Sequence, residues 1–231
     1  MTKRNNGQGG YSAWFVFIAV VFTTCLITAN IIAVKLVRVW GLILPAAIVI
    51  FPLSYVFGDV LTEVYGYRRA RQVIWLGFFC NFLTVMAVLA GQAMPPASFW
   101  DGQAAYERIL GYTPRLLVAS FSAYLVGEFT NAFVLAKMKI ATRGRWLWTR
   151  TIGSTVAGQA LDSAVFITIA FYGVVPLPAL GSTIVTQWLV KSAYEAAVTP
   201  FTYWIVGFLK RREGVDVYDV GTRFNPLLLL E

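Results

Sequence analysis

Residues 51–67 read FPLSYVFGDVLTEVYGY, which begins like an apolar membrane helix and then places two carboxylates, Asp59 and Glu63, one helical turn apart. No basic residue follows until Arg68. A charged side chain at the centre of a bilayer costs roughly 2.5–3.5 kcal/mol, so ionisable residues inside membrane helices usually serve a function. This stretch therefore predicts a membrane helix whose carboxylates meet polar groups on neighbouring helices.

The rest of the chain has the composition of an integral membrane protein. Of 231 residues, 58% are hydrophobic and 13% are charged, whereas a soluble domain carries about 25% charged residues. Six apolar stretches are long enough, at roughly 20 residues each, to cross the hydrocarbon core, and they lie at residues 14–37, 41–62, 73–94, 116–137, 152–174 and 184–209. The longest connection, residues 95–115, has room for a short interfacial helix. Because an isolated strand cannot satisfy its backbone in lipid, we predict an all-α integral membrane protein with six transmembrane helices.

Basic residues fall mainly on one side of the predicted bundle. Of the 19 Lys and Arg residues, 14 lie in the N-terminal tail, the second and fourth connections and the C-terminal tail, and four lie on the opposite side. Because the cytoplasmic loops of membrane proteins are enriched in Lys and Arg, we predict that both termini are cytoplasmic. The predicted parts are an N-terminal tail (1–13), a transmembrane domain (14–209) and a C-terminal tail (210–231). The net charge of +8 is then explained by topology and contact with the lipid bilayer, and no nucleic-acid partner is expected.

Several kinds of chemistry are unsupported by the residues present. The chain has no histidine, which removes the commonest general base and metal ligand. Cys25 and Cys80 lie in separate apolar segments without CxxC spacing, so we expect neither a disulfide nor a metal site. No GxxxxGK[ST] or GxSxG motif is present, so we expect no cofactor and no enzymatic activity. Acid–base chemistry by neighbouring carboxylates is a weaker alternative, and charges of both signs without a ring-like repeat argue against a pore.

A second set of polar residues lies inside the predicted spans and recurs at steps of four. The steps are Tyr55, Asp59 and Glu63 in the second span, Ser120, Tyr124 and Glu128 with Asn131 in the fourth, Arg150, Ser154, Gly158 and Asp162 in the fifth, and Gln187, Lys191, Glu195 and Thr199 in the sixth. Residues four apart share one face of a helix, so each of these helices carries a polar stripe. Stripes that avoid lipid must face one another, which predicts a polar cavity inside the bundle. The alternative is a structural network, such as an ion pair of Lys191 with Asp162 or Glu195.

The predicted cavity is richer in acceptors than in donors. It offers carboxylates, the carboxamides of Asn30, Asn131 and Gln159, the ammonium of Lys191, and aromatic side chains. A carboxylate accepts two hydrogen bonds side by side, and a carboxamide both donates and accepts. This set suits a small planar heterocycle with adjacent N–H donors, or a cationic amine, and suits an inorganic anion poorly.

Three long stretches carry a family resemblance. Residues 51–71 (FPLSYVFGDVLTEVYGYRRAR), 150–166 (RTIGSTVAGQALDSAVF) and 190–219 (VKSAYEAAVTPFTYWIVGFLKRREGVDVYD), together with the tail motif FNP at 224–226, resemble the YhhQ-type family of queuosine-precursor transporters, also called the vitamin uptake transporter family. The resemblance covers about residues 14–226, and the closing LLLLE departs from it. It implies a fold like the substrate-binding subunits of energy-coupling-factor transporters. It also implies uptake of 7-cyano-7-deazaguanine or 7-aminomethyl-7-deazaguanine across the bacterial inner membrane.

The resemblance and the stripes together define a candidate site. The resemblance carries over to Asn30, Asp59, Gln159, Asp162 and Lys191, and the stripes add the remainder. The predicted substrate-binding residues are Asp162, Gln159, Lys191, Asn30, Glu128, Asn131 and Glu195, and the predicted gating or coupling residues are Asp59, Glu63 and Arg150. For a deazaguanine, Asp162 would accept from the guanidine-like edge, and Lys191 would donate to O6 or pair with Asp162.

Partners and energy coupling stay open at this stage. One alternative is a vitamin-type substrate-capture subunit that works with a separate ATP-driven energising module. Proton coupling through a buried carboxylate and uniport of a cationic precursor are equally compatible with the residues. The small-residue pair Ala29 and Ala33 could serve a homodimer or internal helix packing.

Overall fold

Helices make up most of the chain in a computed structural model that describes residues 11–39, 42–111, 114–174 and 176–228. In chain order the elements are α1 (Ala13–Ile32), β1 (Leu36–Val39), β2 (Leu42–Pro45), the 3-10 turn η1 (Ala46–Val49), α2 (Phe51–Val60), the π-helical η2 (Leu61–Tyr65), α3 (Tyr67–Ala93), α4 (Gln103–Leu110), α5 (Pro114–Ala141), α6 (Leu147–Phe171) and α7 (Leu177–Glu213). Most of the predicted N-terminal tail and the last residues of LLLLE lie outside the described residues.

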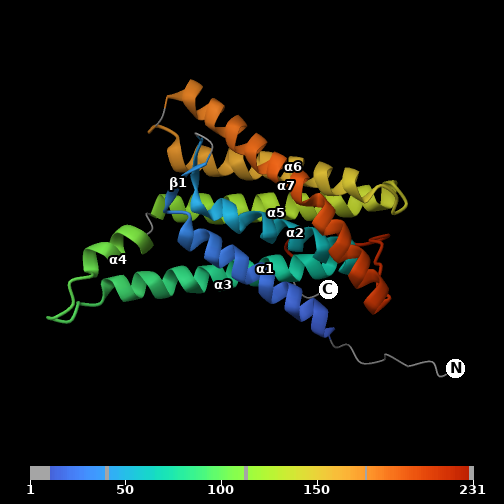
Figure 1. Cartoon of the computed structure of the whole chain (residues 1–231), viewed down its shortest axis with the longest axis horizontal. Coiled ribbons are helices and arrows are strands. Elements are labelled where there is room, and N and C mark those ends of the chain that lie inside the picture. Colours follow the sequence, from blue (N-terminus) through green and yellow to red (C-terminus); the bar gives the residue numbers. More distant parts are fainter. Residues whose placement is uncertain (1–10, 40–41, 112–113, 175, 229–231) are drawn as a thin grey trace.

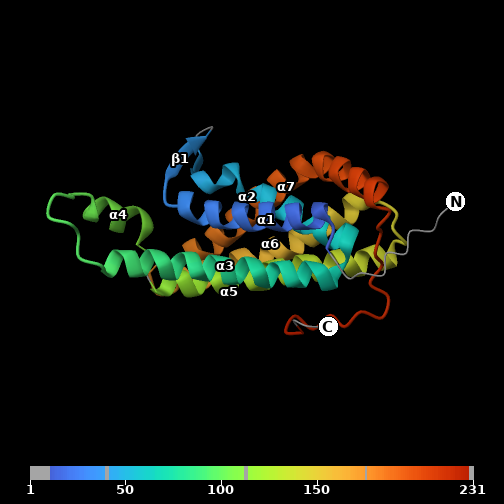
Figure 2. The same ribbon diagram turned by 90° about the horizontal axis from the view of Figure 1, so that it is seen from below.

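The long helices form a closed ring. The most extensive contacts follow the order α1, α3, α5, α6, α7 and α2, with α2 returning to α1, and α2 also touches α5 across the ring. Figure 1 shows α3, α5 and α6 running side by side, with α7 crossing over α6, and Figure 2 shows α1 and α2 on the opposite side from α3 and α5. The side chains of α2, α5, α6 and α7 that point into the ring are therefore brought together.

The chain passes back and forth between two ends of this ring. The start of α1, the turn from η2 into α3, the α5–α6 turn and the end of α7 lie at one end, while the β1–β2 hairpin, α4 and the α6–α7 turn lie toward the other (Figures 1 and 2). We call the first the strap end, after the C-terminal segment that is described below, and the second the hairpin end. The connections predicted to be rich in basic residues all lie at the strap end.

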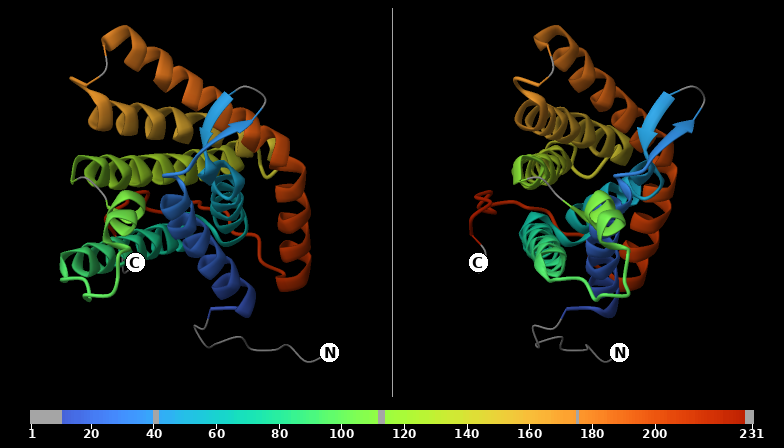
Figure 3. Two further views of the ribbon diagram at one scale, coloured as in Figure 1. Left: turned by 60° about the vertical axis from the view of Figure 1, so that its left-hand side comes forward. Right: turned by 90° about the vertical axis from the view of Figure 1, so that its left-hand side faces the viewer.

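Four helical segments are long and apolar enough to cross a membrane, judged by length and composition over the described residues. They are Ala13–Ile32, Tyr67–Ala93, Gln103–Ala141 and Leu147–Phe171. The short helix expected between residues 95 and 115 is present as α4. In α7 the helix bends along its length (Figure 3), and Pro200, which lacks an N–H for the helical hydrogen bond, lies inside it.

A hairpin replaces part of two predicted spans. The predictions of helix over 14–37 and 41–62 are wrong at their adjoining ends, because α1 stops at Ile32 and Leu36–Val39 pairs antiparallel with Leu42–Pro45. Hydropathy alone does not separate a helix from a strand in a short apolar run. Here the Val and Ile residues favour extended backbone, and Pro45 ends the second strand. The second helical pass is therefore shorter than predicted and consists of η1, α2 and η2.

After α7 the chain folds back over the strap end, and we call residues 214–226 the C-terminal strap. Its backbone bonds to the bundle in both directions: Val217 N–H of the strap donates to Val64 O at 3.2 Å, while Arg71 Nη1 and Trp75 Nε1 of α3 donate to Asn225 O and Pro226 O, each at 2.8 Å. The predicted tail boundary at residue 209 lies inside α7, which continues to Glu213. Arg71, expected in a connection, is instead a buried residue of α3.

Candidate functional site

Four carboxylates from four helices gather inside the ring. They are Asp59 of α2, Glu128 of α5, Asp162 of α6 and Glu195 of α7, and all four side chains are buried. Glu128 interacts electrostatically with Asp59 and Asp162, and Glu195 interacts with Asp59 and Glu128. The polar stripes predicted on the second, fourth, fifth and sixth spans therefore do face one another. We call this group the interior cluster.

Two carboxylates of the interior cluster bond directly to a polar side chain on a neighbouring helix, and we include these two side chains and Gln159 in the cluster. Asn131 Nδ2 donates to Asp59 Oδ1 at 2.8 Å, which joins α5 to α2. Lys191 Nζ lies 2.6 Å from Asp162 Oδ2, which joins α7 to α6. Of the two predicted partners for Lys191, the structure selects Asp162. This pairing brings one positive charge into an otherwise acidic group.

Glycines allow the helices to approach closely at this level. A Cβ added to Gly158 would lie 2.9 Å from Gly127 O and 3.0 Å from Asn131 Cβ, so α5 and α6 touch backbone to backbone. A Cβ on Gly127 would lie 2.9 Å from Asp162 Cβ and 3.5 Å from the Tyr55 hydroxyl oxygen. Tyr55, a member of the polar stripe predicted on the second span, is therefore close to the part of α5 that faces Asp162. These contacts fix the distances between the polar side chains on α2, α5 and α6.

Several buried polar atoms make no hydrogen bond to any described residue, and three of them are carboxylate or carboxamide oxygens on α2, α5 and α6. They are Asp59 Oδ2, Asn131 Oδ1 and Gln159 Oε1. Their side chains are 0%, 1% and 1% exposed. Buried polar groups are normally hydrogen-bonded, so three open acceptors on three neighbouring helices are unusual. Together they can accept N–H groups from a molecule held among the helices.

Asn30 lies apart from the interior cluster. Its Nδ2 donates to Asn81 Oδ1 at 3.1 Å, which joins α1 to α3. Asn81 is a buried polar residue of α3 that the sequence interpretation did not select. A carboxamide in the middle of an apolar helix was the available signal, because such residues commonly bond across membrane helices. The structure therefore brings together six of the seven predicted substrate-binding residues, and Asn30 is the exception.

A second polar group lies at the strap end and centres on Glu63. Arg150 Nε and Nη2 donate to the two Glu63 carboxylate oxygens, each at 2.8 Å, and Lys210 Nζ lies 2.5 Å from Glu63 Oε1. Arg150 Nη1 also donates to Arg145 O at 2.6 Å. The fork of a guanidinium matches a carboxylate in this bidentate geometry. Of the three predicted gating residues, Glu63 and Arg150 form this pair, whereas Asp59 belongs to the interior cluster.

Lys139 ties this second group to the C-terminal strap. Its Nζ donates to Glu63 O at 2.5 Å, Asp216 Oδ1 at 2.6 Å and Val217 O at 2.7 Å. Lys210 Nζ also reaches Asp216 Oδ1 at 2.9 Å. We call Glu63, Lys139, Arg150, Lys210 and Asp216 the strap-end network. It joins η2, α5, α6, α7 and the strap.

The sequence interpretation missed three members of this network: Lys139, Lys210 and Asp216. Lys139 was placed in a connection, yet it is a residue of α5 and its side chain is 1% exposed. It follows Asn131 by eight residues, which keeps it on the same face of the helix. That periodicity was the available signal. Lys210 and Asp216 carried no comparable pattern, because their partners come from distant parts of the chain.

The cations of the network act on Asp216. Partial burial on its own would raise the pKa of Asp216, but hydrogen bonds from Lys139 and Lys210 and the charges of these two residues outweigh it. The net result is a pKa below the ordinary aspartate value. Asp216 is therefore ionised at neutral pH and attaches the strap electrostatically.

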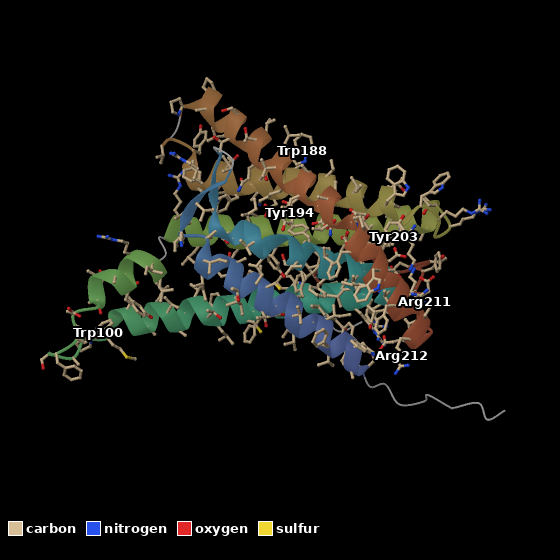
Figure 4. The ribbon with its side chains drawn as sticks, in the orientation of Figure 1. Trp100, Trp188, Tyr194, Tyr203, Arg211 and Arg212 are labelled. Carbon is tan, nitrogen blue, oxygen red and sulfur yellow. The ribbon has the colours of Figure 1, made fainter. Side chains whose placement is uncertain are left out.

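Aromatic side chains on α7 are fixed mainly by backbone contacts. Trp188 Nε1 donates to Val156 O at 2.9 Å, and Trp148 N–H donates to the Tyr203 hydroxyl at 2.8 Å. Figure 4 shows Trp188, Tyr194 and Tyr203 in succession along α7, with Arg211 and Arg212 in its last turns. These bonds connect α7 to α6 along much of its length. Lys191 and Glu195 lie on α7 between these two contacts.

Neither a metal site nor a large hollow is described at the interior cluster. Among the described residues, no group of three or more Cys, Asp or Glu side chains is placed to hold a metal ion. An open depression lies elsewhere, at the α6–α7 turn, where it is lined by Tyr172, Gly173, Val174, Pro176 and Leu177. The enclosed cavity expected from the stripes stays a prediction. The chemistry that the interior cluster offers is hydrogen bonding and ion pairing.

Comparison with known proteins points to transport. The family model described as "Putative vitamin uptake transporter" matches residues 45–205. A Bacillus subtilis protein named "Probable queuosine precursor transporter" is 31% identical over 196 residues, which is 84% of each chain. The "Queuosine precursor transporter" of Escherichia coli K12 is 25% identical over 53% of this chain and 52% of its own. A Haemophilus influenzae relative with the same name as the Bacillus protein is 26% identical over 53% of this chain and 49% of its own.

No solved structure matches the chain. The matched range runs from the end of β2 through most of α7, so it contains the whole interior cluster and three of the five residues of the strap-end network, Glu63, Lys139 and Arg150. The family and these relatives are named for transport and for no enzymatic reaction. On these grounds the chain belongs to the vitamin uptake transporter family.

Proposed function

We propose that this protein is an uptake transporter for queuosine precursors in the bacterial inner membrane, with 7-cyano-7-deazaguanine and 7-aminomethyl-7-deazaguanine as its substrates. The names of its relatives support the substrate class. The observation that carries the proposal is the interior cluster, with three open acceptors and one ammonium buried between helices. A deazaguanine presents adjacent N–H donors on one edge and a carbonyl beside them, which matches this set.

The proposed topology has six membrane crossings and two cytoplasmic termini. Its support is the alternation of α1, α2–η2, α3, α5, α6 and α7 between the two ends of the ring (Figure 1). The excess of Lys and Arg at the strap end supports a cytoplasmic location for that end. Reporter fusions in the α5–α6 turn and in the β1–β2 hairpin would test it, and a cytoplasmic signal from the hairpin would contradict it.

The proposed substrate-binding residues keep the predicted set. Asp162, Lys191, Gln159 and Asn131 are supported by their position in the interior cluster, and Glu128 and Glu195 complete it. Asn30 stays in the set on the family resemblance, since its bond to Asn81 lies outside the cluster.

Glu63 and Arg150 are proposed as a gate between the interior cluster and the cytoplasm. Their pair lies at the strap end, where four elements and the strap converge on one buried carboxylate. A substrate leaving the ring at this end would have to pass that network. Opening would require the strap to release Lys139, which bonds to both Glu63 and the strap.

Two kinds of protein partner are considered, an energising module and a second copy of this chain. A separate ATP-driven energising module remains the alternative mode of action, in which the chain would capture a vitamin-type substrate. A homodimer through Ala29 and Ala33 is less favoured, because Ala29 is already buried within the single chain. Ala33, which follows the end of α1, is only partly buried.

Calorimetry on purified, detergent-solubilised protein tests the proposed function. Both deazaguanines, guanine and several vitamins would be titrated into the wild type and into Asp162→Asn. We expect tight binding of a deazaguanine, weakened in the variant by about 1.5–3 kcal/mol, the range for a hydrogen bond to a charged group. Binding of a vitamin instead would retain the transporter and discard the substrate. Undiminished deazaguanine binding to Asp162→Asn would contradict the role of Asp162.

A further inference from the structure

We infer that Asp59, which the sequence suggested as a gating or coupling residue, contacts the substrate directly and accepts its N–H edge, with Asn131 and Gln159 completing the acceptor set. In this arrangement the Asp162–Lys191 pair presents an ammonium to the substrate carbonyl. The inference rests on the proposed function and specifies which residues read which edge of the heterocycle.

Asp59 is the carboxylate with an open position. One of its oxygens accepts from Asn131 at 2.8 Å, and the other makes no hydrogen bond to any described residue although the side chain is fully buried. Leaving a buried polar atom without a partner is unfavourable. A ligand N–H at this oxygen would supply the partner. Asp162, by contrast, already has the Lys191 ammonium at 2.6 Å.

Asn131 offers an open acceptor toward a ligand. Its amide nitrogen donates to Asp59, which turns the amide so that Oδ1 points elsewhere, and this oxygen has no partner among the described residues. Gln159 adds a third open acceptor from α6. The close backbone contact of Gly158 with Asn131 places this part of α6 directly beside α5. The three acceptors therefore come from neighbouring helices, α2, α5 and α6.

Lys191 supplies the complementary donor from α7. Its side chain is 19% exposed, and its Nζ lies 2.6 Å from Asp162 Oδ2. This pairing orients the ammonium within the ring. Asp162 is in this sense a positioning residue that acts through Lys191. The acceptors of α2, α5 and α6 then match the exocyclic amine and the ring N–H of the substrate. The Lys191 donor matches the carbonyl that follows them along the same edge of the ring.

This arrangement distinguishes substrates by their hydrogen-bonding groups rather than by their size. A heterocycle that lacks the exocyclic amine would leave one acceptor buried without a partner. Sites built to hydrogen-bond a substrate group reject analogues that lack the group, because the polar atoms of the site are then left unpaired. An inorganic anion would meet three acceptors and is excluded by charge. The structure therefore assigns the preference for an amino-substituted ring to Asp59 and its two neighbours.

The test compares two ligands on several variants. Binding of 7-cyano-7-deazaguanine and of its analogue without the exocyclic amine would be measured by calorimetry on the full-length protein in detergent. We expect the wild type to prefer the amino compound by roughly 10–100-fold, because its analogue would leave a buried polar atom without a partner. Asp59→Asn should reduce this preference to near unity. Asp162→Asn should weaken both ligands alike and leave the ratio unchanged.

Gln159→Met provides a second variant that changes no charge. It removes an acceptor while keeping the side-chain length, and we expect it to lower the preference as well. Thermal unfolding of each variant would show that binding is compared between folded proteins. An unchanged preference in both Asp59→Asn and Gln159→Met, or its loss in Asp162→Asn, would overturn the inference while leaving the proposed function standing. Failure of the wild type to bind either ligand would overturn both.

Discussion

The Glu63 carboxylate is neutralised by cations from three different helices at a point that solvent does not reach. Arg150 donates to both of its oxygens, and Lys210 and Lys139 lie 2.5 Å and 3.6 Å from Oε1. Bringing charges out of water is unfavourable, and only close pairing with further hydrogen bonds offsets the cost. The side chain is therefore a point where loss of one charge affects several partners.

Glu63→Gln should destabilise the protein strongly. Removing one partner of a buried ion pair typically costs about 3–5 kcal/mol, because the remaining charges are left without compensation. The measurement is the free energy or midpoint of unfolding in detergent. Glu213→Gln is the matched control, since Glu213 makes a single bond of 2.6 Å with the Tyr65 hydroxyl at the edge of the same region. Equal losses in the two variants would contradict the central role of Glu63.

For single residues, the sequence indicated which charged side chains lie inside the helices better than it indicated their bonding partners. Asp59, Asp162 and Lys191 were identifiable because a charge in an apolar helix stands out against its neighbours. The choice of Asp162 over Glu195 as the partner of Lys191 depends on how α6 and α7 are rotated, which a stripe does not specify. Lys139 was missed because it lies beyond the apolar stretch, where a lysine usually reaches solvent.

Among the elements, α5 and α6 have the closest contact. Gly127 and Gly158 face each other, and a side chain on either would meet backbone or Cβ atoms at about 3 Å. Small residues at helix interfaces let membrane helices pack through van der Waals contact. This contact also sets the separation between Asn131 and Asp162, so the packing of two helices determines the geometry of the interior cluster.

Gly158→Ala should separate α5 from α6. The added methyl group would overlap Gly127 O and Asn131 Cβ, and overpacking of this kind costs about 1–3 kcal/mol. Gly207→Ala in α7 is the matched control, because its nearest neighbour would be Arg211 Nη2 at 3.9 Å. In the control we expect stability that is unchanged or raised by up to about 1 kcal/mol, since alanine favours helix. Thermal unfolding in detergent compares them, and similar midpoints would contradict this account of the interface.

Element boundaries followed from the sequence where the apolar stretches were long and well separated. The third to sixth predicted spans all lie within or largely within α3, α5, α6 and α7. The hairpin at residues 36–45 was missed because its residues are as apolar as those of a membrane helix. Its register depends on the pairing of two strands, which no local periodicity over four residues can reveal.

For the molecule as a whole, the ring of helices leaves two ends, and the C-terminal strap covers one of them. Phe224 of the strap packs against Phe133 of α5, with ring centroids 5.3 Å apart, and against Tyr67 of α3 at 4.9 Å. Asp219 accepts from the Tyr67 backbone N–H at 3.0 Å. Release of substrate at this end would therefore require movement of a segment that contacts several helices at once. None of these long-range contacts was predictable from the sequence, because they join residues about 90 to 150 positions apart.

Tethering the strap to the bundle should block transport without abolishing binding. Phe133→Cys and Phe224→Cys would be introduced into a protein whose Cys25 and Cys80 are replaced by alanine. A short bifunctional thiol reagent that a reductant can cleave would link the new pair. We expect uptake into liposomes to stop on linking and to return on reduction, because the linked strap cannot leave the strap end.

The control pair is Phe201→Cys and Trp204→Cys, whose rings are 5.9 Å apart on α7 alone. The same reagent would then link two positions of one helix and leave the strap free, so uptake should continue. Unimpaired uptake by the protein with the linked strap would show that the substrate leaves by another route.

The position of the strap after α7 has a consequence for the order in which the strap-end network is completed. Glu63, Lys139 and Arg150 belong to η2, α5 and α6, whereas Asp216 and Val217 follow all of these helices in the chain. Lys139 gains Asp216 and the Val217 carbonyl only when the strap reaches the bundle. A chain whose helices have packed but whose strap has not is therefore without these bonds at the strap end.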